Sequence, residues 1–400
     1  MPTAREWQQA LSREYQLIIE SSSSLCNEVL GRQNQRDIER RQSGRISPAT
    51  KALRPWPKAG GLSSVKVRPI EILQSLGRIT TPVITELIDL ASTWAEIRYV
   101  WAFRPNFTSR FARTLRLSPA VKELDFHQKT LLSDEFGVAF AAYYMARFEN
   151  ATDPIDAFVA RRNRQVRLVG NSRRSVPDYI FSGPQPEQYF VVECKGTQGP
   201  RTTAVGQLQR GSEQVVTVAL DPPAKAIRLV IGAVLSGSMT LLILDPDEDE
   251  NEGNRTLARW STEEIRLFSC AKRLTYIGDN VGAARLLDRR HFEFPLQEPW
   301  GETEMSIREN DLGVFLGTEE QRRTPDGHQI RMFRGIEKLT LEAVRDGVPK
   351  ARLLNAGRLP EIGSAEHDES PFHVETSSGP ETAIVRSIAS DGSIFEVSIG

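Results

Sequence analysis

Hydrophobic positions recur at two spacings along this chain, and the two spacings separate helical segments from strands. Residues 69–99 follow the i, i+3, i+4 period of amphipathic helices, with Pro82 placed to begin a second helix. Residues 131–148 are apolar almost all round, which predicts a buried helix with Ser133 as its N-cap and two acids in its first turn. Residues 1–30 read as a polar helix that a run of serines interrupts.

The middle of the chain holds short runs that are rich in β-branched and aromatic residues. These runs predict strands, and a helix separates the third strand from the fourth. The predicted strands are 165–169, 177–181, 189–193, 226–235 and 239–244, and the predicted helix is 204–218. The order of helix, three strands, helix and two strands is typical of an α/β fold with a mixed central β-sheet flanked by helices.

An acidic, proline-containing run at 245–252 is the clearest boundary in the chain. It predicts three parts: a helical, basic N-terminal region (1–117), an α/β core (118–246) and an acidic, mixed α+β C-terminal region (254–400). In the last part the sequence predicts helices at 262–274 and 280–290. It also predicts a closing β-hairpin from 382–387 and 393–399.

Composition limits the class of protein. With 39% apolar and 26% charged residues, and no apolar run of roughly 18 residues, the chain is expected to be a soluble, cytoplasmic protein without membrane contact. The three cysteines, Cys26, Cys194 and Cys270, are far apart, which favours a reducing compartment over a disulfide framework or a zinc site.

Charge divides the chain into unlike halves. Residues 1–246 carry a net charge of +9, and residues 247–400 carry −10. A basic half suits an anionic partner such as nucleic acid, although ordinary solvated surface would give the same count. The basic segment 31–68 includes Trp56, for which two interpretations are open: it stacks on a base, or it packs against a neighbouring helix of the same chain.

The strongest candidates for functional residues lie at the end of the predicted strand 189–193. Glu193 and Lys195 are two positions apart, so their side chains point to the same face, whereas Cys194 points to the opposite face as core. Asp178 begins the preceding strand, and the turn-rich segment 182–187 joins the two. A hairpin would therefore bring Asp178, Glu193 and Lys195 together. Two carboxylates with the carbonyl oxygen of Cys194 are ligands that Mg²⁺ accepts, with Mn²⁺ as an alternative, and an ammonium there would orient water or phosphate.

The pattern Pro-Asp178, then Glu193-Cys-Lys195-Gly, resembles the PD-(D/E)XK nuclease superfamily, which has the restriction-endonuclease-like fold. The resemblance covers about 131–244 and implies catalytic or metal-binding roles for Glu135 on the preceding helix and Gln207 on the following one. Local arginines would then position nucleic acid by its phosphates. They are Arg161, Arg162, Arg164, Arg167, Arg173, Arg174, Arg201 and Arg210.

These observations favour a metal-dependent nuclease that hydrolyses phosphodiester bonds, with DNA as the expected substrate. The resemblance also implies a bacterial restriction or phage-defence effector, and cutting both strands would need a homodimer or a partner protein. Three alternatives stay open: a non-catalytic nucleic-acid-binding module on the same fold, a protein-interaction scaffold, and a simple surface ion pair between Glu193 and Lys195.

Overall fold

The structure is a computed structural model of the 400-residue chain. It describes residues 2–43, 52–59, 61–82, 95–105, 112–151, 154–157, 159, 176–185, 188–215, 225–246, 262–288, 305–323, 327–345, 371–379 and 382–400.

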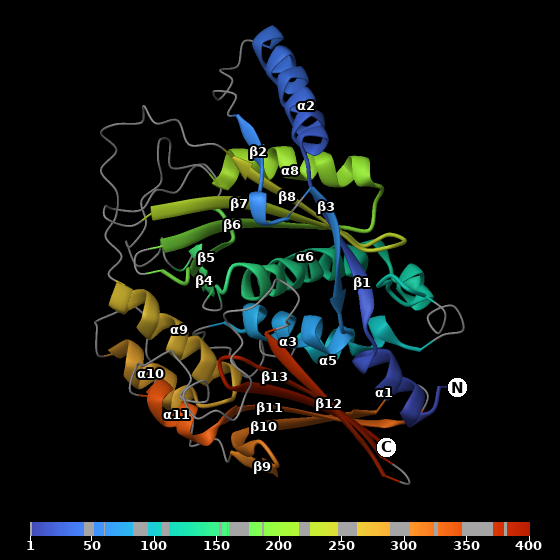
Figure 1. The fold of residues 1–400 in the computed structure, drawn as a ribbon, viewed down its shortest axis with the longest axis vertical. Coiled ribbons are helices and arrows are strands. Elements are labelled where there is room, and N and C mark those ends of the chain that lie inside the picture. Colours follow the sequence, from blue (N-terminus) through green and yellow to red (C-terminus); the bar gives the residue numbers. More distant parts are fainter. Residues whose placement is uncertain are drawn as a thin grey trace.

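A mixed β-sheet forms the centre of the described part (Figure 1). Seven of its eight strands follow the order β3-β1-β8-β7-β6-β5-β4, and β2 also pairs with β8. The pairs β6/β7 and β1/β8 are parallel, and the other pairs are antiparallel. The strands are β1 (Tyr15–Ser21), β2 (Leu53–Pro55), β3 (Gly61–Val67), β4 (Pro154–Asp156), β5 (Tyr179–Ser182), β6 (Gln188–Thr197), β7 (Lys225–Val234) and β8 (Thr240–Pro246).

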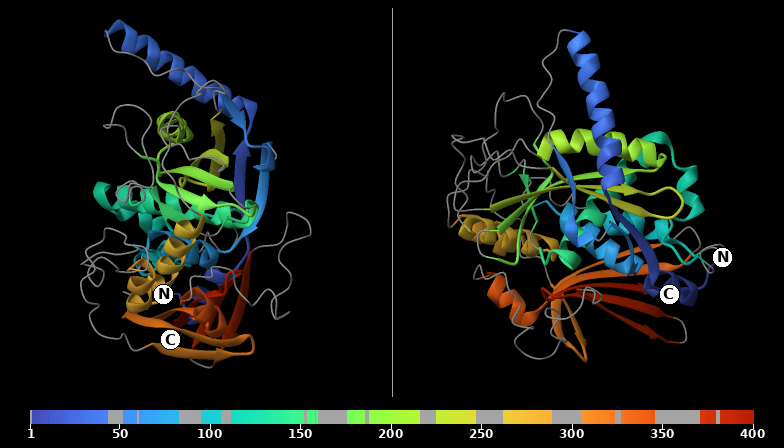
Figure 2. Two further views of the ribbon diagram at one scale, coloured as in Figure 1. Left: turned by 90° about the vertical axis from the view of Figure 1, so that its left-hand side faces the viewer. Right: turned by 45° about the horizontal axis from the view of Figure 1, so that its top comes forward.

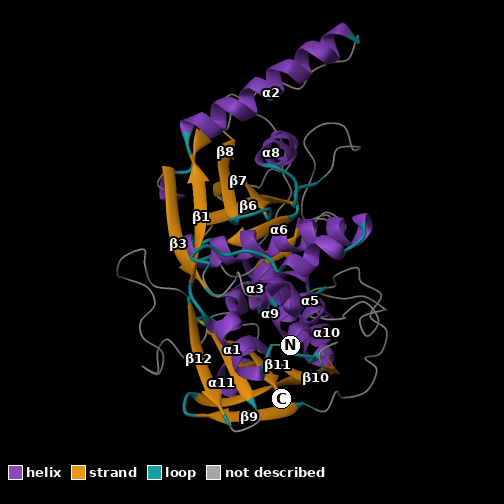
Figure 3. Cartoon of the chain, turned by 90° about the vertical axis from the view of Figure 1, so that its right-hand side faces the viewer, coloured by secondary structure: helices purple, strands orange, loops and turns teal. Residues whose placement is uncertain are grey.

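Helices cover both faces of this sheet, as Figures 1 and 3 show. Helix α8 (Arg201–Val215) lies on one face beside α2 (Ser23–Gln42), and α6 (Phe126–Phe148) lies on the other. Strand β6 alternates between the two layers. Phe190 and Val192 join the cluster that contains the α6 residues, whereas Val191 joins the cluster around Leu208 of α8. Because both faces are covered, the middle of β6 is apolar on both sides.

The predicted core elements are present. The hairpin of β5 and β6, the helix α8 after it and the strands β7 and β8 all lie within a few residues of their predicted positions. The predicted strand 165–169 lies outside the described residues, and β4 stands between α6 and β5 instead. The observed order is therefore α6, β4, β5, β6, α8, β7, with the parallel step from β6 to β7 made through α8.

Two predictions for the N-terminal half are wrong. The region 1–117 is not purely helical, because β1, β2 and β3 belong to the central sheet. Helices α1 (Ala4–Ser12), α2, α3 (Pro69–Thr80) and α5 (Ala95–Tyr99) accompany them, and α2 projects beyond the sheet in both views of Figure 2. Helix α6 begins at Phe126, where the Asp125 side chain accepts a hydrogen bond from the Gln128 amide at 2.9 Å. Ser133 is therefore inside the helix and is not its N-cap.

The C-terminal part forms a second sheet, an antiparallel half-barrel, below the α6 layer in Figure 1. Its core side chains, such as Phe395 and Val397, join the same hydrophobic cluster as α3 and α6. The predicted helices and closing hairpin are confirmed. The elements are α9 (Thr262–Tyr276), α10 (Asn280–Asp288), β9 (Ser306–Asn310), β10 (Gly313–Arg323), β11 (Gln329–Glu337), α11 (Lys338–Arg345), β12 (Phe372–Ser378), β13 (Ala383–Ala389) and β14 (Ser393–Ile399).

Several predicted features lie outside the described residues: the helix expected after Pro82, most of the acidic boundary, and the arginines at 161–174. No helix in the described ranges combines the length and the apolar content that a membrane crossing requires.

Helix α6 crosses strand β6 where Gly137 of the helix meets Gly196 of the strand, and this contact sets the distance between the helix and the strand. A Cβ on Gly196 would lie 1.8 Å from the carbonyl oxygen of Ser133, and one on Gly137 would lie 2.7 Å from the Gly196 nitrogen. We expect Gly196→Ala to destabilise the protein by about 1–3 kcal/mol, because backbone atoms on both sides must move. Gly31→Ala on α2 is the control, since nothing lies within 4 Å of its Cβ position. Equal urea midpoints for the two variants would show that the contact is not tight.

Candidate metal and catalytic site

The β5/β6 hairpin brings the predicted residues to one place. Tyr179 pairs with Val192, so the next position outward sets Asp178 opposite Glu193. The Cys194 amide donates to Asp178 Oδ2 at 2.8 Å, and the Lys195 ammonium is hydrogen-bonded to Glu193 Oε1. Asp178, Glu193 and Lys195 therefore converge, as predicted, at the point where β5 ends and β6 continues.

The two faces of β6 are used as the strand period requires. Glu193 lies against α8, where its Cγ is 3.1 Å from the position of a Cβ on Gly211. Cys194 points the other way and joins the core cluster on the α6 side, with 6% of its surface exposed. The prediction that Cys194 is a core residue is confirmed. Its thiol pKa is raised well above its usual value, first by burial and then by the charges of Asp178 and Glu193.

Glu193 is the most unusual titratable group of the site. Its side chain is fully buried, and its Oε2 has no hydrogen-bond partner among the described residues. Burial, and then the like charge of Asp178, raises the pKa of Glu193 to about 8, although Lys195 acts in the opposite direction. The negative charge of Glu193 must therefore be removed by protonation or be balanced by a neighbouring lysine or a bound cation.

The charges of the neighbours follow the same logic. Burial raises the pKa of Asp178. The charge of Lys195 and the hydrogen bond from the Cys194 amide oppose this effect, whereas the like charges of Asp156 and Asp134 add to it, and the pKa lies above its usual value. Burial lowers the pKa of Lys195, but the carboxylates of Glu193 and Asp178 outweigh that effect, and the pKa lies above its ordinary value. Lys195 is thus held as an ammonium in this conformation.

Helix α6 contributes differently from the prediction. Glu135 and Asp134 lie well inside the helix, not in its first turn, and Glu135 Oε1 is ion-paired with Arg98 of α5 at 2.6 Å. Asp134 is the α6 acid whose charge raises the pKa of Asp178, and the charge of Lys195 in turn lowers the pKa of Asp134. The sequence pattern marked Asp134 only as one of the two acids in the predicted first turn, and it did not single out Asp156, the residue paired with Tyr179 across β4 and β5.

A metal could be held here by few protein ligands. In the described ranges no group of three or more His, Cys, Asp or Glu side chains is placed to hold one ion, so Glu135 does not join Asp178 and Glu193 in this conformation. The Cys194 amide points to Asp178, and in a strand the carbonyl of the same residue points to the same neighbour. Two carboxylates with one unpartnered oxygen, and one carbonyl, suit Mg²⁺, which keeps several of its waters.

The flanking polar residues divide into two groups. Gln207 Nε2 donates to the carbonyl of Gly196 at 3.4 Å, so this side chain rests on the strand just after Lys195, and its Oε1 has no partner in the described part of the chain. Arg210, three residues on, is exposed on α8. Arg201 is bound instead by Glu20, at 2.7 Å, and by Glu28, so it ties α8 to β1 and α2.

Trp56 follows the second of its two interpretations. Its ring meets Phe190 of β6 edge to face, with the centroids 6.4 Å apart, and its indole nitrogen donates to Glu149 Oε1 at 2.7 Å. Trp56 is thus partly buried in the packing between β6 and the end of α6, which favours the second interpretation.

The site carries a pH prediction. Above pH 4.5, the usual pKa of a glutamic acid, the unfolded chain loses the Glu193 proton, whereas the folded protein keeps it until about pH 8. The folded state then binds more protons, so stability falls as pH rises through this window. We expect Glu193→Gln, measured with EDTA, to gain about 1 kcal/mol or more over the wild type between pH 4.5 and pH 8.5.

The control for this prediction is the exposed Glu309→Gln, which should follow the wild type at every pH. Urea unfolding at both pH values gives the difference directly. A Glu193→Gln variant whose stability relative to the wild type did not change with pH would contradict the raised pKa.

Comparison of the chain with protein-family models, with curated proteins and with solved structures finds no match.

Proposed function

We propose that the chain is a metal-dependent nuclease that hydrolyses phosphodiester bonds, with DNA as its substrate. The observation that carries the proposal is Glu193: a fully buried carboxylate with an unpartnered oxygen, opposite Asp178 and bonded to Lys195. A core residue placed for stability alone would not keep two acids this close, because each acid raises the free energy of ionising the other.

The fold around the site supports the same proposal. A mixed sheet with α6 on one face and α8 on the other, and with the acids at the β5/β6 hairpin, agrees with the restriction-endonuclease-like core that the sequence pattern suggested. The strands β1, β2 and β3 lie on the far side of β7, so they do not cover the β5/β6 hairpin where the site lies.

Asp178, Glu193 and the carbonyl of Cys194 would hold the ion, with Mg²⁺ as the proposed metal and Mn²⁺ as an alternative. When bound, the ion supplies a water of lowered pKa and polarises the phosphate that is to be cleaved. Asp134 and Glu135 are candidates for contact through water molecules from α6.

Lys195 is the residue of this chain that supplies positive charge at the candidate site. If a cation were held at Glu193, the Lys195 ammonium would be available to donate hydrogen bonds to a phosphate oxygen or to the attacking water. Gln207 holds the backbone after Lys195 through its hydrogen bond to the Gly196 carbonyl, and its Oε1 has no partner among the described residues.

Nucleic acid would reach the site across α8. Arg210 is exposed on that helix and is a candidate for phosphate contact, whereas Arg201 is bound by two glutamates. If both strands are cut, a homodimer or a partner protein is proposed, and the resemblance to the nuclease superfamily alone suggests a restriction or phage-defence role in the cytoplasm.

Cleavage assays test the function. Purified wild-type protein is incubated with supercoiled plasmid, single-stranded DNA and RNA, each with Mg²⁺, with Mn²⁺ and with EDTA. We expect metal-dependent cleavage of DNA that Asp178→Asn abolishes and Glu309→Gln leaves intact. Salt-sensitive DNA binding without cleavage under either metal would favour the non-catalytic module instead, and indifference to all three nucleic acids would reject both.

A further inference from the structure

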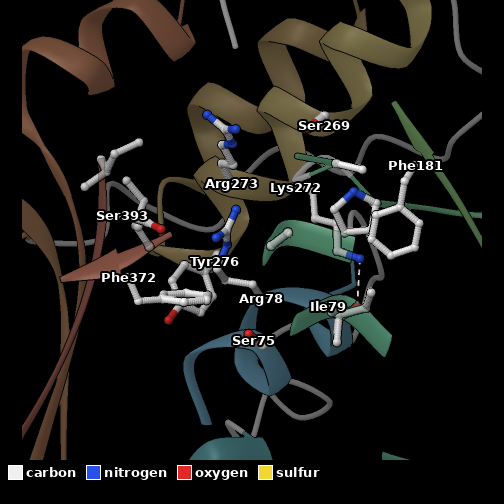
Figure 4. A pocket seen from close by; sticks show the side chains of 16 residues that line it. Ser75, Arg78, Ile79, Phe181, Ser269, Lys272, Arg273, Tyr276, Phe372 and Ser393 are labelled. Atoms are coloured by element: carbon white, nitrogen blue, oxygen red, sulfur yellow. Dashed lines mark hydrogen bonds between the residues drawn. The ribbon is translucent and has the colours of Figure 1, made fainter. Parts of the chain in front are cut away.

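A pocket large enough for a small ligand lies near the end of strand β6. Its volume is about 380 Å³, within the usual range of small-molecule pockets. By contrast, the cavity between α3, α6 and α9 that Figure 4 shows holds about 40 Å³, and two cations on its wall, Arg78 and Arg273, are both paired with Asp391. The pocket near β6 therefore has the room for a ligand that the cavity lacks.

Segments that are far apart in the sequence build this pocket. One is the segment 112–122, another is the turn 235–237 between β7 and β8, and the third contribution is Gln198, just after β6. The Leu115 amide donates to a carbonyl of β1 at 2.9 Å, and the Leu115 carbonyl accepts from the residue before β8 at 3.0 Å. The central sheet thus holds the first segment in place, so the pocket is formed before any ligand binds.

Both ionisable side chains among the described lining residues are cations, Arg116 and Lys122. Both are exposed, and neither forms an ion pair within the described part of the chain. The guanidinium of Arg116 donates to the hydroxyls of Thr114 and Ser238, each at 3.4 Å, but neutral hydroxyls do not balance its charge. Two uncompensated cations would therefore attract an anion into the pocket.

The rest of the lining combines apolar surface with an amide in a fixed position. Leu117, Val121 and Leu235 supply the apolar side chains. Gln198 Nε2 donates to the Lys129 carbonyl at 3.0 Å, and the Oε1 of Gln198 accepts no hydrogen bond from the described residues. Cations, apolar surface and a hydrogen-bond acceptor match the three parts of a nucleotide, which are the phosphate, the faces of the base and its amino edge.

The pocket adjoins the candidate site. Gln198 follows Lys195 by three residues, so their Cα atoms are at most about 11 Å apart. The Leu235 amide donates to the Thr197 carbonyl at 2.8 Å, which joins the β7/β8 turn to the end of the same strand. At roughly 3.4 Å of rise per nucleotide in B-form DNA, this span corresponds to about three nucleotides, and to fewer in an extended strand.

We propose that this pocket binds one unpaired nucleotide of the strand that the candidate site would cleave, an inference that rests on the proposed nuclease function. A double helix is far wider than a pocket of this volume, so the nucleotide enters only from a single-stranded segment. Because a nucleotide within a strand has a phosphate on each side, Arg116 and Lys122 need not reach the same phosphate. The proposal narrows the substrate to DNA with unpaired nucleotides beside the cut.

Binding in EDTA tests the proposal without any use of cleavage. The full chain is titrated into a short fluorescein-labelled oligothymidylate and into a blunt duplex of the same length, and fluorescence anisotropy measures each affinity. We expect the single strand to bind at least about tenfold more tightly than the duplex. Thymidine monophosphate, added as a competitor, should bind at least about tenfold more weakly than the oligomer, because it lacks the second phosphate.

Variants separate the pocket from general electrostatic attraction. Ser236→Trp places a large side chain at an exposed position of the lining and leaves the charges unchanged, so it should weaken single-strand binding by about tenfold and spare the duplex. Arg116→Met and Lys122→Met should each weaken single-strand binding by about threefold or more. Ser64→Trp and Lys338→Met are exposed controls outside the pocket and should bind like the wild type.

Three results would overturn the proposal: equal affinity for single strand and duplex, equal affinity for the monophosphate and the oligomer, or a Ser236→Trp variant that binds the single strand as the wild type does. Thermal unfolding of each variant confirms that it is folded. Single-strand binding that shows these preferences in a protein without cleavage would reject the nuclease function and leave the binding site standing.

Discussion

Lys195→Met is expected to lower metal-dependent DNA cleavage by at least about 100-fold while the protein stays folded. The Lys195 ammonium is hydrogen-bonded to Glu193 Oε1, and its charge also lowers the pKa of Asp178, so it acts on both acids of the site. Loss of a single donor aimed at developing charge typically costs 10²–10³ in rate. Methionine keeps the length and most of the volume of lysine, which separates the loss of charge from a loss of packing.

The matched control is Lys338→Met, an exposed lysine of α11 that should leave cleavage within about twofold of the wild type. Cleavage rates at saturating substrate distinguish a catalytic role from a binding role, since loss of a phosphate contact alone would raise KM and spare kcat. Equal kcat in wild type and Lys195→Met would remove Lys195 from the mechanism. A fall in both variants would point to general damage.

Arg334→Met is expected to cost about 3–5 kcal/mol of unfolding free energy, the largest stability effect that we predict. Arg334 of β11 pairs with Glu96 of α5, and the side chains are 4% and 0% exposed. The guanidinium also lies over the ring of Tyr276, 4.9 Å from its centroid. Removal of the arginine leaves a buried carboxylate without its cation at the contact between the helical layer and the C-terminal sheet.

A second measurement identifies the cause of that loss. Protonation of Glu96 would relieve the unpaired charge, so the deficit of Arg334→Met should shrink as the pH falls from 7 toward 4.5. Glu14→Gln is the control, because its pair with Arg68 is solvent-exposed and should be worth less than about 1 kcal/mol. A deficit that does not depend on pH would assign the effect to lost packing and not to charge.

The central hairpin could be predicted because its information is local. Asp178, Glu193 and Lys195 lie within eighteen consecutive residues, counted along the printed sequence, and the period of β6 alone fixes which side chains share a face. The close crossing of α6 at Gly196 could not be predicted, since it depends on where the Ser133 carbonyl arrives from another part of the chain. The same is true of Asp134 and Asp156, whose proximity to Asp178 is a product of packing.

The N-terminal strand shows the limit most clearly. Strand β1 is seven residues long and is held by β3 and β8, the latter more than 200 residues away, so its pairing outweighs the helical character of the polar residues around it. The start of α6 was missed for another reason: its first turn is polar apart from Phe126, which is 86% exposed, so no apolar period marks it. Only the Asp125 cap signals that end of the helix.

The claim at the centre of the account is that Asp178 and Glu193 hold one divalent cation. Titration of the protein with Mn²⁺ at pH 7.5, followed by electron paramagnetic resonance of the free ion, measures this without any substrate. We predict one ion bound per chain, displaced by Mg²⁺, lost in both Asp178→Asn and Glu193→Gln, and retained in Glu309→Gln. Wild-type protein that binds no Mn²⁺, or binds it equally well in all four forms, would contradict the claim.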